Sequence, residues 1–273
     1  SLVRKAPMMV FDPDSPLYLR WRYLPRLLPW LIPFLRNANP KRMHEIAGPL
    51  AEMTFDSTEQ HMALARGTKA QAFITRGDYI SLYRSRSYWE QDTLTAEIQK
   101  RFDMVPAPLT RAELAERDRN LGPDYTFGTI YSDFGWLSSP AGYVRALFDH
   151  YRGQGGDFRQ ASVVDVTPGE APTVTLEGGE ILTADKVVLS AGAWSRRFAK
   201  SLGMTIRLEA ERGYHVSMAN PSFTAPHPYM VTDAKFVLTP MQGALRAAGV
   251  VEFAGLDGPE HPEPPKFIAK AVK

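Results

Sequence analysis

The sequence contains no cysteine in 273 residues. This absence excludes disulfides, thiolate metal sites and thiol nucleophiles, and it is typical of a reducing compartment. The six histidines are scattered. The segment most similar to a zinc-protease helix starts at His44-Glu45, but Gly48 stands where the second histidine is required. We therefore predict no metal site, and a cytoplasmic location or one peripheral to the inner membrane.

The sequence also lacks a strong charge bias and a long apolar run. Its formal net charge is +2 and its pI about 8.7, so no global field favours nucleic acid. The most apolar segment, residues 17–35, is interrupted by Arg20, Arg22 and Arg26, which predicts no transmembrane helix. The chain begins with neither Met nor a signal peptide, and we expect it to be an internal fragment.

Common phosphate and nucleophile motifs are absent as well. There is no Gly-x-Ser-x-Gly elbow and no P-loop, which disfavours hydrolases and nucleoside triphosphatases. Gly153-Gln154-Gly155 follows a predicted helix, and Phe158 stands where the third glycine of a dinucleotide loop is needed. The sequence therefore contains no motif that predicts a pyrophosphate-binding turn.

Several segments have helical patterns. Apolar residues from Trp21 to Leu35 follow helical spacing, but Pro25, Pro29 and Pro33 predict short, kinked turns. Arginines interleave with tryptophans here, which permits two interpretations: a surface that touches anionic lipid, or a helical cap over the core with solvated arginines. We favour the cap. Further helices are predicted over residues 40–65, 87–102 and 141–151, and a capping box at Thr110 and Glu113 predicts a short one.

Other segments have strand character. Residues 72–83 predict a hairpin around an Arg-Gly-Asp turn, and residues 127–131 predict a strand followed by a turn over residues 132–140. Short strands are predicted at residues 163–166, 174–176 and 181–182. The apolar run of residues 187–189 predicts a strand buried on both faces of a parallel sheet, which turns at Ala191-Gly192-Ala193 into a helix near Ser195. The small residues at this turn permit two interpretations: a cofactor that lies against the backbone, or close packing of the helix on the strand. The residues alone do not decide between them.

Five blocks in a fixed order resemble the D-amino acid oxidase superfamily of FAD enzymes, in particular the branch of bacterial D-amino acid dehydrogenases and glycine oxidases. The blocks are residues 24–31 with their downstream helix, the Asp133-x-Gly135 turn before Pro140, and residues 184–195, 211–216 and 239–255. The resemblance covers nearly the whole chain. The chain lacks the family's opening Gly-x-Gly-x-x-Gly unit and its closing substrate-binding segment, so we expect the fragment alone to be inactive.

The resemblance implies a mixed α+β and α/β fold. A partial, Rossmann-like FAD-binding domain would be interleaved with a substrate domain built on a mixed, largely antiparallel sheet with helices. The implied boundaries are residues 1–134 for the first part of the substrate domain, 135–205 for part of the FAD-binding domain, and 206–273 for the second part of the substrate domain.

The resemblance also implies site residues. Val163 matches the position whose backbone meets the adenine of FAD, and Ala191, Gly192, Ala193 and Trp194 match the turn that passes the ribityl and flavin region. Gly249, with its neighbours 246–248, matches the strand that approaches the flavin from the substrate lobe. For the substrate, the implied residues are Tyr214, Phe236, Val237 and Arg246.

The implied activity is FAD-dependent oxidation of an amine or amino acid of the D-amino acid dehydrogenase type, in which the substrate's α-hydrogen passes to the flavin as hydride. We favour a dehydrogenase over an oxidase, because the motifs are more similar to those of the bacterial dehydrogenases. We assign no catalytic base, because lone histidines such as His215 and His227 are more often packed or solvated than catalytic. Two alternatives remain: an amine oxidase of the sarcosine or glycine oxidase type, and a cofactor-free binding or accessory module that retains only the substrate lobe. Weak contact with a membrane surface stays a further hypothesis, and the oligomeric state is open.

Overall fold

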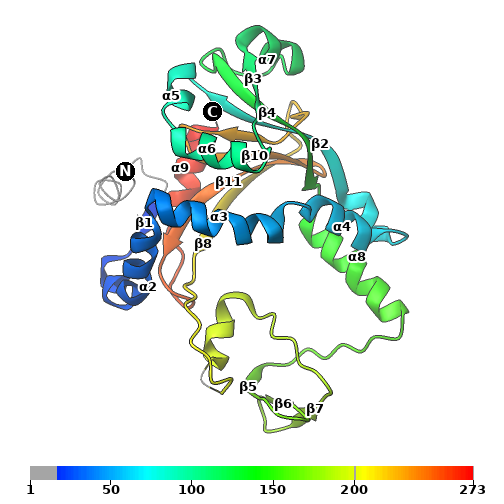
Figure 1. Cartoon of the computed structure of the whole chain (residues 1–273). Coiled ribbons are helices and arrows are strands. Elements are labelled where there is room, and N and C mark those ends of the chain that lie inside the picture. Colours follow the sequence, from blue (N-terminus) through cyan, green and yellow to red (C-terminus); the bar gives the residue numbers. More distant parts are fainter. Residues whose placement is uncertain (1–16, 200, 273) are drawn as a thin grey trace.

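The computed structural model describes residues 17–199 and 201–272. Within these residues, eight strands form one mixed sheet and three form a small antiparallel sheet. The large sheet and its helices make an upper lobe, and the small sheet lies in a lower lobe that extended segments connect to it (Figure 1). The structure therefore confirms a mixed α and β fold.

The large sheet has the order β1-β11-β10-β9-β2-β4-β3, and β8 pairs with the other side of β11. Most neighbours are antiparallel, whereas β1–β11 and β2–β9 are parallel. Strand β10 pairs with β11 over Ala244 to Ala248, and β1 pairs with it over Val251 to Phe253. The bounds are β1 (Leu17–Leu19), β2 (Ile74–Tyr83), β3 (Ala107–Thr110), β4 (Phe127–Leu137), β8 (Arg212–Ala219), β9 (Tyr229–Val231), β10 (Phe236–Met241) and β11 (Ala244–Phe253).

The predicted hairpin at residues 72–83 is wrong. These residues form the 3-10 helix η2 (Lys69–Phe73) and then one continuous strand, β2. The Arg-Gly-Asp segment is an irregularity in its pairing with β4, where the register shifts between Gly77 and Tyr79. A bulge absorbs the extra residue without reversing the chain, because β2 finds partners on both of its edges.

Strand β4 is longer than predicted. It continues through the expected turn over residues 132–140 as far as Leu137, and it pairs with β2 along this length. Asp133 adopts a positive φ of 65° within it, a conformation that Asp tolerates better than most residues. The turn-like composition of this segment therefore marks a local distortion of a strand.

The helices also differ in detail from the predictions. The proline-containing segment is one helix, α2 (Leu24–Asn37), with Pro29 and Pro33 inside it. The predicted helix over residues 40–65 is two helices, α3 (Pro40–Thr54) and α4 (Ser57–Ala65), and that over residues 87–102 is also two, α5 (Arg86–Glu90) and α6 (Thr93–Arg101). The capping box at Thr110 is confirmed on α7 (Arg111–Arg117), as is the helix α8 (Pro140–Gly153). Helix α9 (Glu263–Ala271) follows β11.

The lower lobe contains the predicted short strands β5 (Val163–Thr167), β6 (Thr173–Leu176) and β7 (Ile181–Thr183). The predicted buried strand at residues 187–189 is wrong: the segment has no regular structure, and Val188 is 85% exposed. Within the described residues no parallel strand lies beside it to accept its backbone hydrogen bonds. The chain then enters the 3-10 helix η3 (Gly192–Phe198) in place of the predicted α-helix.

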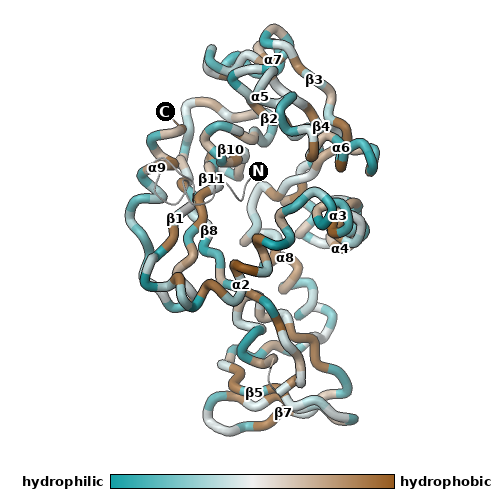
Figure 2. The backbone as a smooth tube through the Cα atoms, turned by 60° about the vertical axis from the view of Figure 1, so that its left-hand side comes forward, coloured by the Kyte–Doolittle hydropathy of each residue, from teal (hydrophilic) through white to brown (hydrophobic). Residues whose placement is uncertain are grey.

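The buried core belongs mainly to the upper lobe. Leu82, Ile80 and Tyr229 pack under α7, and Ala247, Val250 and Ile268 pack between the sheet and α9. Tyr143 of α8 packs with Ala65 and Ala70 in a third cluster. Apolar residues also occur along α2 and in the lower lobe (Figure 2), and several of them, such as Ile32 and Val188, are exposed. The site described next therefore rests on the better-packed lobe.

Candidate active site

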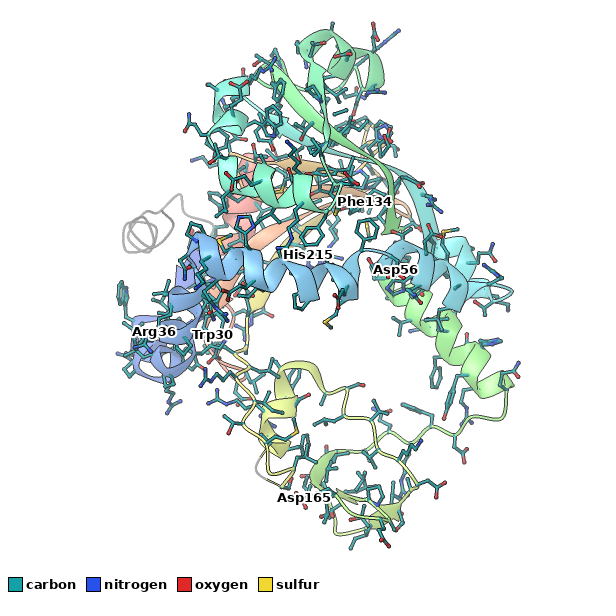
Figure 3. The ribbon with its side chains drawn as sticks, viewed as in Figure 1. Trp30, Arg36, Asp56, Phe134, Asp165 and His215 are labelled. Atoms are coloured by element: carbon teal, nitrogen blue, oxygen red, sulfur yellow. The ribbon has the colours of Figure 1, made fainter. Side chains whose placement is uncertain are left out.

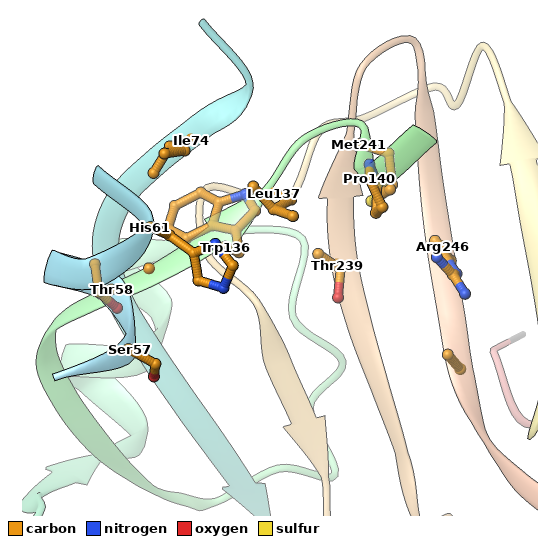
Figure 4. A pocket seen from close by; sticks show the side chains of 12 residues that line it. Ser57, Thr58, His61, Ile74, Trp136, Leu137, Pro140, Thr239, Met241 and Arg246 are labelled. Carbon is orange, nitrogen blue, oxygen red and sulfur yellow. The ribbon is translucent and has the colours of Figure 1, made fainter. Parts of the chain in front are cut away.

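A cavity of about 380 Å³ lies where α4 and the end of β4 face β10 and β11 (Figure 4). This volume is in the range of small-molecule sites. One wall carries His61 and Trp136, and the other carries Thr239 and Arg246. The lining residues are Ser57, Thr58, His61, Ile74, Gly135, Trp136, Leu137, Pro140, Thr239, Met241, Arg246 and Ala248.

Close approach of α4 to β4 shapes the first wall. A Cβ on Gly135 would lie 2.6 Å from Cγ2 of Thr58, so only glycine permits this contact without a shift. Arg76 of β2 forms ion pairs with both elements: its Nε lies 2.5 Å from Asp133 Oδ1 of β4, and its Nη2 lies 2.6 Å from Glu59 Oε1 of α4. The glycine and the ion pairs together hold α4 over the end of β4.

Arg246 is the cationic residue of the cavity. Strand alternation places Leu245 and Ala247 in the core, and Arg246 and Ala248 on the cavity face of β11. Its Nε is buried and has no hydrogen-bond partner within the described part of the chain. A buried donor without a partner is costly, and here it belongs to a guanidinium at the cavity wall. The arrangement fits an anionic ligand group such as a carboxylate.

His215 lies next to this guanidinium, with its Nδ1 3.4 Å from Arg246 Nη2. It is on the side of the sheet that α3 crosses (Figure 3). Burial and, to a smaller degree, the charge of Arg246 lower the pKa of His215 below its usual 6.5. At neutral pH the ring is therefore uncharged, and its Nδ1 can accept a hydrogen bond from Arg246. This contact orients the guanidinium, whereas the sequence alone favoured a packed or solvated histidine.

Of the four predicted substrate residues, Arg246 lines the cavity and the others do not. Tyr214 points to the opposite side of the sheet, where its hydroxyl donates a hydrogen bond to Glu252 Oε2 at 2.6 Å. Phe236 is a core residue at 3% exposure. Val237 shares its strand face with Thr239, two residues on, but is not part of the lining.

The predicted cofactor residues are divided between the lobes. Val163 belongs to β5, and residues 191–194 are the N-cap and first residues of η3, both in the lower lobe, whereas Gly249 belongs to β11 in the upper lobe. Gly192 has a φ of 53°, and an added Cβ would meet nothing within 4 Å. Trp194 is 50% exposed and Val163 is 40% exposed. This open backbone turn and its exposed apolar neighbours fit a flat cofactor, but the described residues do not enclose one.

Backbone packing within the chain requires glycine at position 249. A Cβ there would lie 2.2 Å from the carbonyl oxygen of Lys235 and 2.4 Å from Cα of Phe236. It is also the residue at which the pairing of β8 with β11 shifts register. The structure thus supplies a packing role for Gly249, and contact with the flavin stays a prediction.

Sequence reasoning missed the α4 wall, namely Ser57, Thr58 and His61, and it missed Trp136. These residues come from two elements whose contact depends on the tertiary fold. The available signal was Gly135, which the sequence placed in a motif but which could not be connected to α4 without the structure.

Comparisons with known proteins bear on this site. Solved structures with a similar fold include L-proline dehydrogenase from P. horikoshii, with a TM-score of 0.65 and 15% identity, covering 79% of this chain and 60% of that one. Glycine oxidase from Bacillus cereus has a TM-score of 0.60 and 16% identity, covering 86% of this chain and 63% of that one. The fold is therefore of the class found in these oxidoreductases.

Sequence relatives define the family. A family described as FAD dependent oxidoreductase (DAO) matches residues 21–272. A D-amino-acid oxidase from Bradyrhizobium diazoefficiens is 34% identical over 93% of this chain and 61% of its own length. A D-amino acid dehydrogenase from Phenylobacterium zucineum is 25% identical over 93% of this chain and 61% of its own length. The chain belongs to the DAO family of FAD-dependent oxidoreductases, and it spans about 61% of the length of these curated relatives.

The family assignment confirms the resemblance that the sequence blocks indicated. The relative named an oxidase is more similar to this chain than the relative named a dehydrogenase, so the preference for dehydrogenases over oxidases gains no support. None of the helices in the described part of the chain has the length and hydrophobicity of a membrane-spanning segment.

Proposed function

We propose that the protein carrying this chain oxidises an amino acid with FAD, and that the cavity between α4 and β11 binds the substrate. The observation that carries the proposal is Arg246, whose buried Nε has no partner within the described residues and whose guanidinium lines the cavity. Family membership supplies the cofactor. The names of the relatives support a D-amino acid as the substrate.

Arg246 would bind the substrate carboxylate through charge-assisted hydrogen bonds, with neutral His215 accepting from its Nη2. The Thr239 hydroxyl and the apolar side chains of Trp136 and Met241 would restrict the substrate and exclude water. FAD, when bound, supplies the acceptor for the α-hydrogen as hydride. Fixing the carboxylate orients the α-carbon, and no residue of the described chain is assigned as a base.

The proposed cofactor contacts are Val163, Ala191, Gly192, Ala193, Trp194 and Gly249. The open turn at Gly192 supports the lower-lobe part of this set, because its backbone is accessible to a ligand. The division into a substrate domain and part of an FAD-binding domain, with boundaries near residues 135 and 205, also stays a proposal. In the structure, β4 remains in the large sheet to Leu137.

The test uses the full-length gene product with FAD and follows dye reduction driven by a panel of D-amino acids. Arg246→Leu should lower kcat/KM by about 10- to 100-fold, the effect of losing a hydrogen bond to a charged group. Arg36→Leu, on α2 and outside the cavity, is the matched control and should leave kcat/KM unchanged. An equal loss in both variants, or no loss in either, would contradict the proposed carboxylate site.

The same protein preparation also tests the two alternative functions, a cofactor-free accessory module and an amine oxidase of the sarcosine or glycine oxidase type. A colourless protein that added FAD fails to reconstitute would favour the cofactor-free accessory module. Oxidation of sarcosine or glycine, with no turnover of larger D-amino acids, would favour an amine oxidase of that type. Oxygen consumption measured beside dye reduction would identify the electron acceptor.

Contact of α2 with an anionic membrane surface is a second proposal. The helix is continuous, and Leu28, Ile32 and Phe34 are 40%, 45% and 51% exposed, an arrangement that suits an interfacial helix. Its other side is tied to the sheet, where Trp30 packs against Phe253 at 5.4 Å between ring centroids. Flotation with liposomes tests this: binding should rise with anionic lipid, and binding that ignores lipid charge would eliminate the proposal.

A further inference from the structure

We infer that His61 is a specificity-determining residue, which donates a hydrogen bond from Nε2 to a carbonyl oxygen at the end of the substrate's side chain. The inference rests on the proposed function, because it takes the cavity as the substrate site. It names the substrate class as amino acids whose side chains end in an amide or similar acceptor.

Tyr143 fixes the His61 ring. The Tyr143 hydroxyl lies 2.9 Å from His61 Nδ1, and the rings meet edge to face with centroids 5.6 Å apart. Tyr143 is 3% exposed and packs against Ala65 and Ala70, so α8 holds it rigidly. His61 thus reaches the cavity from α4 with its orientation set by a residue of a different helix.

This hydrogen bond also selects the tautomer of the histidine. Burial raises the pKa of Tyr143, so its phenol keeps its proton at neutral pH. The Tyr143 hydroxyl has no other acceptor among the described residues, so we assign it as the donor to Nδ1, which leaves the N–H of the ring on Nε2. Nε2 has no hydrogen-bond partner within the described part of the chain, and the ring is exposed on the cavity wall. His61 Nε2 is therefore a hydrogen-bond donor that a ligand in the cavity can reach.

The two ends of the cavity have complementary roles. Arg246 stands on one wall and His61 on the other, and the lining includes the apolar side chains of Ile74, Leu137 and Met241 (Figure 4). The hydroxyls of Ser57 and Thr58 belong to the same wall as His61. A substrate carboxylate at Arg246 would direct its side chain along apolar surface toward His61. A donor at that position favours side chains that carry a carbonyl oxygen over apolar side chains of the same shape.

Matched ligands test the inference in the FAD-loaded, full-length protein. D-asparagine and D-leucine have nearly the same shape, but only the first carries a side-chain carbonyl. We expect wild type to oxidise D-asparagine with the higher kcat/KM. His61→Leu should lower the asparagine-to-leucine ratio by about 3- to 10-fold, the effect of one neutral hydrogen bond.

Binding without turnover gives an independent readout. The non-oxidisable acids 3-carbamoylpropanoate and 4-methylpentanoate are the deaminated counterparts of the two substrates, and calorimetry would measure both Kd values. In His61→Leu, only the affinity for 3-carbamoylpropanoate should fall. Tyr143→Phe, which removes the hydroxyl but keeps the ring, should cause a smaller fall in the same direction, and His61→Gln, which retains a donor, should restore part of the preference.

His150→Leu is the matched control, because His150 is exposed on α8 and does not line the cavity. It should leave the asparagine-to-leucine ratio at its wild-type value. An unchanged ratio in His61→Leu, in an enzyme that oxidises D-amino acids, would overturn the inference and leave the proposed function intact. Absence of any D-amino acid oxidation, with flavin bound, would instead overturn the proposed function.

Discussion

Glu252 is a charged residue with 0% exposure, located on β11 next to the strand region that carries Arg246. Arg20 Nε lies 2.5 Å from its Oε1, and Arg212 Nη1 lies 3.2 Å from its Oε2. Burial alone would raise the pKa of this carboxyl, but hydrogen bonds from Tyr214 and Arg20 and the two positive charges outweigh burial and lower it. Arg212 also donates to the carbonyl oxygens of Gly258 and Pro259, and Arg20 donates to that of Pro259, so the carboxylate and its two arginines hold the loop that follows β11.

We predict that Glu252→Gln lowers the free energy of unfolding by about 3 kcal/mol, because the substitution leaves two partly buried guanidinium groups without their buried counter-charge. Glu263→Gln is the control: it removes an exposed pair with Lys266 at 2.9 Å and should cost less than about 1 kcal/mol. Urea denaturation of both variants measures the difference. Equal losses would show that the buried charge is unimportant.

The pH dependence of Glu252 has a definite sign. Since its pKa is lower folded than unfolded, its contribution to stability is complete above the unfolded value of about 4.5 and is lost as pH falls through the folded pKa. Wild type should therefore lose stability more steeply than Glu252→Gln below about pH 4.5. Urea midpoints measured across this acid range provide the test, and parallel curves would contradict it.

His215 gives a prediction for substrate binding. Because its pKa is lowered from 6.5, the ring stays neutral at that pH and gains its proton only in more acidic solution. Protonated His215 cannot accept from Arg246, so KM for a D-amino acid should rise by about 3-fold or more on acidification. His215→Gln keeps an acceptor and does not titrate, so the ratio of wild-type to variant KM should rise as pH falls from about 7.5 to about 5. A ratio independent of pH would remove His215 from the site.

At the scale of elements, Gly249 permits β11 to lie close to the backbone at the start of β10. A Cβ at this position would lie 2.2 Å from a backbone oxygen, which cannot move aside as a flexible side chain can. We predict that Gly249→Ala destabilises the protein by up to about 3 kcal/mol through overpacking. Gly213→Ala on the adjacent strand is a close control, because an added Cβ there meets nothing within 4 Å, and it should change stability by less than about 0.5 kcal/mol. Thermal or urea unfolding compares the two, and similar losses would contradict the argument.

The elements also show which parts of the fold local sequence determines. The capping box at Thr110 and the proline start of α8 were predictable, because their signals are contained within a few residues. Strand β2 was not, because a Gly-Asp pair fits either a tight turn or a bulge, and the choice depends on the pairing of β2 with β4 and β9. The same applies to residues 187–189, whose apolar pattern requires neighbouring strands to become a strand.

The candidate site divides in a similar way. Arg246 could be predicted from its motif and proved to line the cavity, whereas Tyr214 and Phe236 belong to strands near the site but point away from it. Period-two alternation on β8 and β10 decides this, and the sequence alone does not show which face of each strand meets the cavity. His61 was missed because its role depends on Tyr143, which lies 82 positions away in the chain.

At the scale of the whole molecule, the two lobes differ in packing. The upper lobe contains the main buried clusters, whereas in the lower lobe Val164, Ile181, Val188 and Trp194 are 57%, 62%, 85% and 50% exposed. Few buried apolar contacts correspond to low local stability. In the full-length protein without FAD, we therefore expect amides of residues 163–198 to exchange with deuterium faster than those of β2 and β4.

Adding FAD gives the decisive form of this experiment. If Val163 and the Gly192 turn contact the cofactor, FAD should slow exchange of the lower-lobe amides, because ligand binding opposes local opening. Strands β2 and β4, paired along their lengths, serve as the internal reference and should show little change. Protection equal in both lobes would indicate general stabilisation instead of contact, and protection absent from residues 163–198, with flavin bound, would place the cofactor elsewhere.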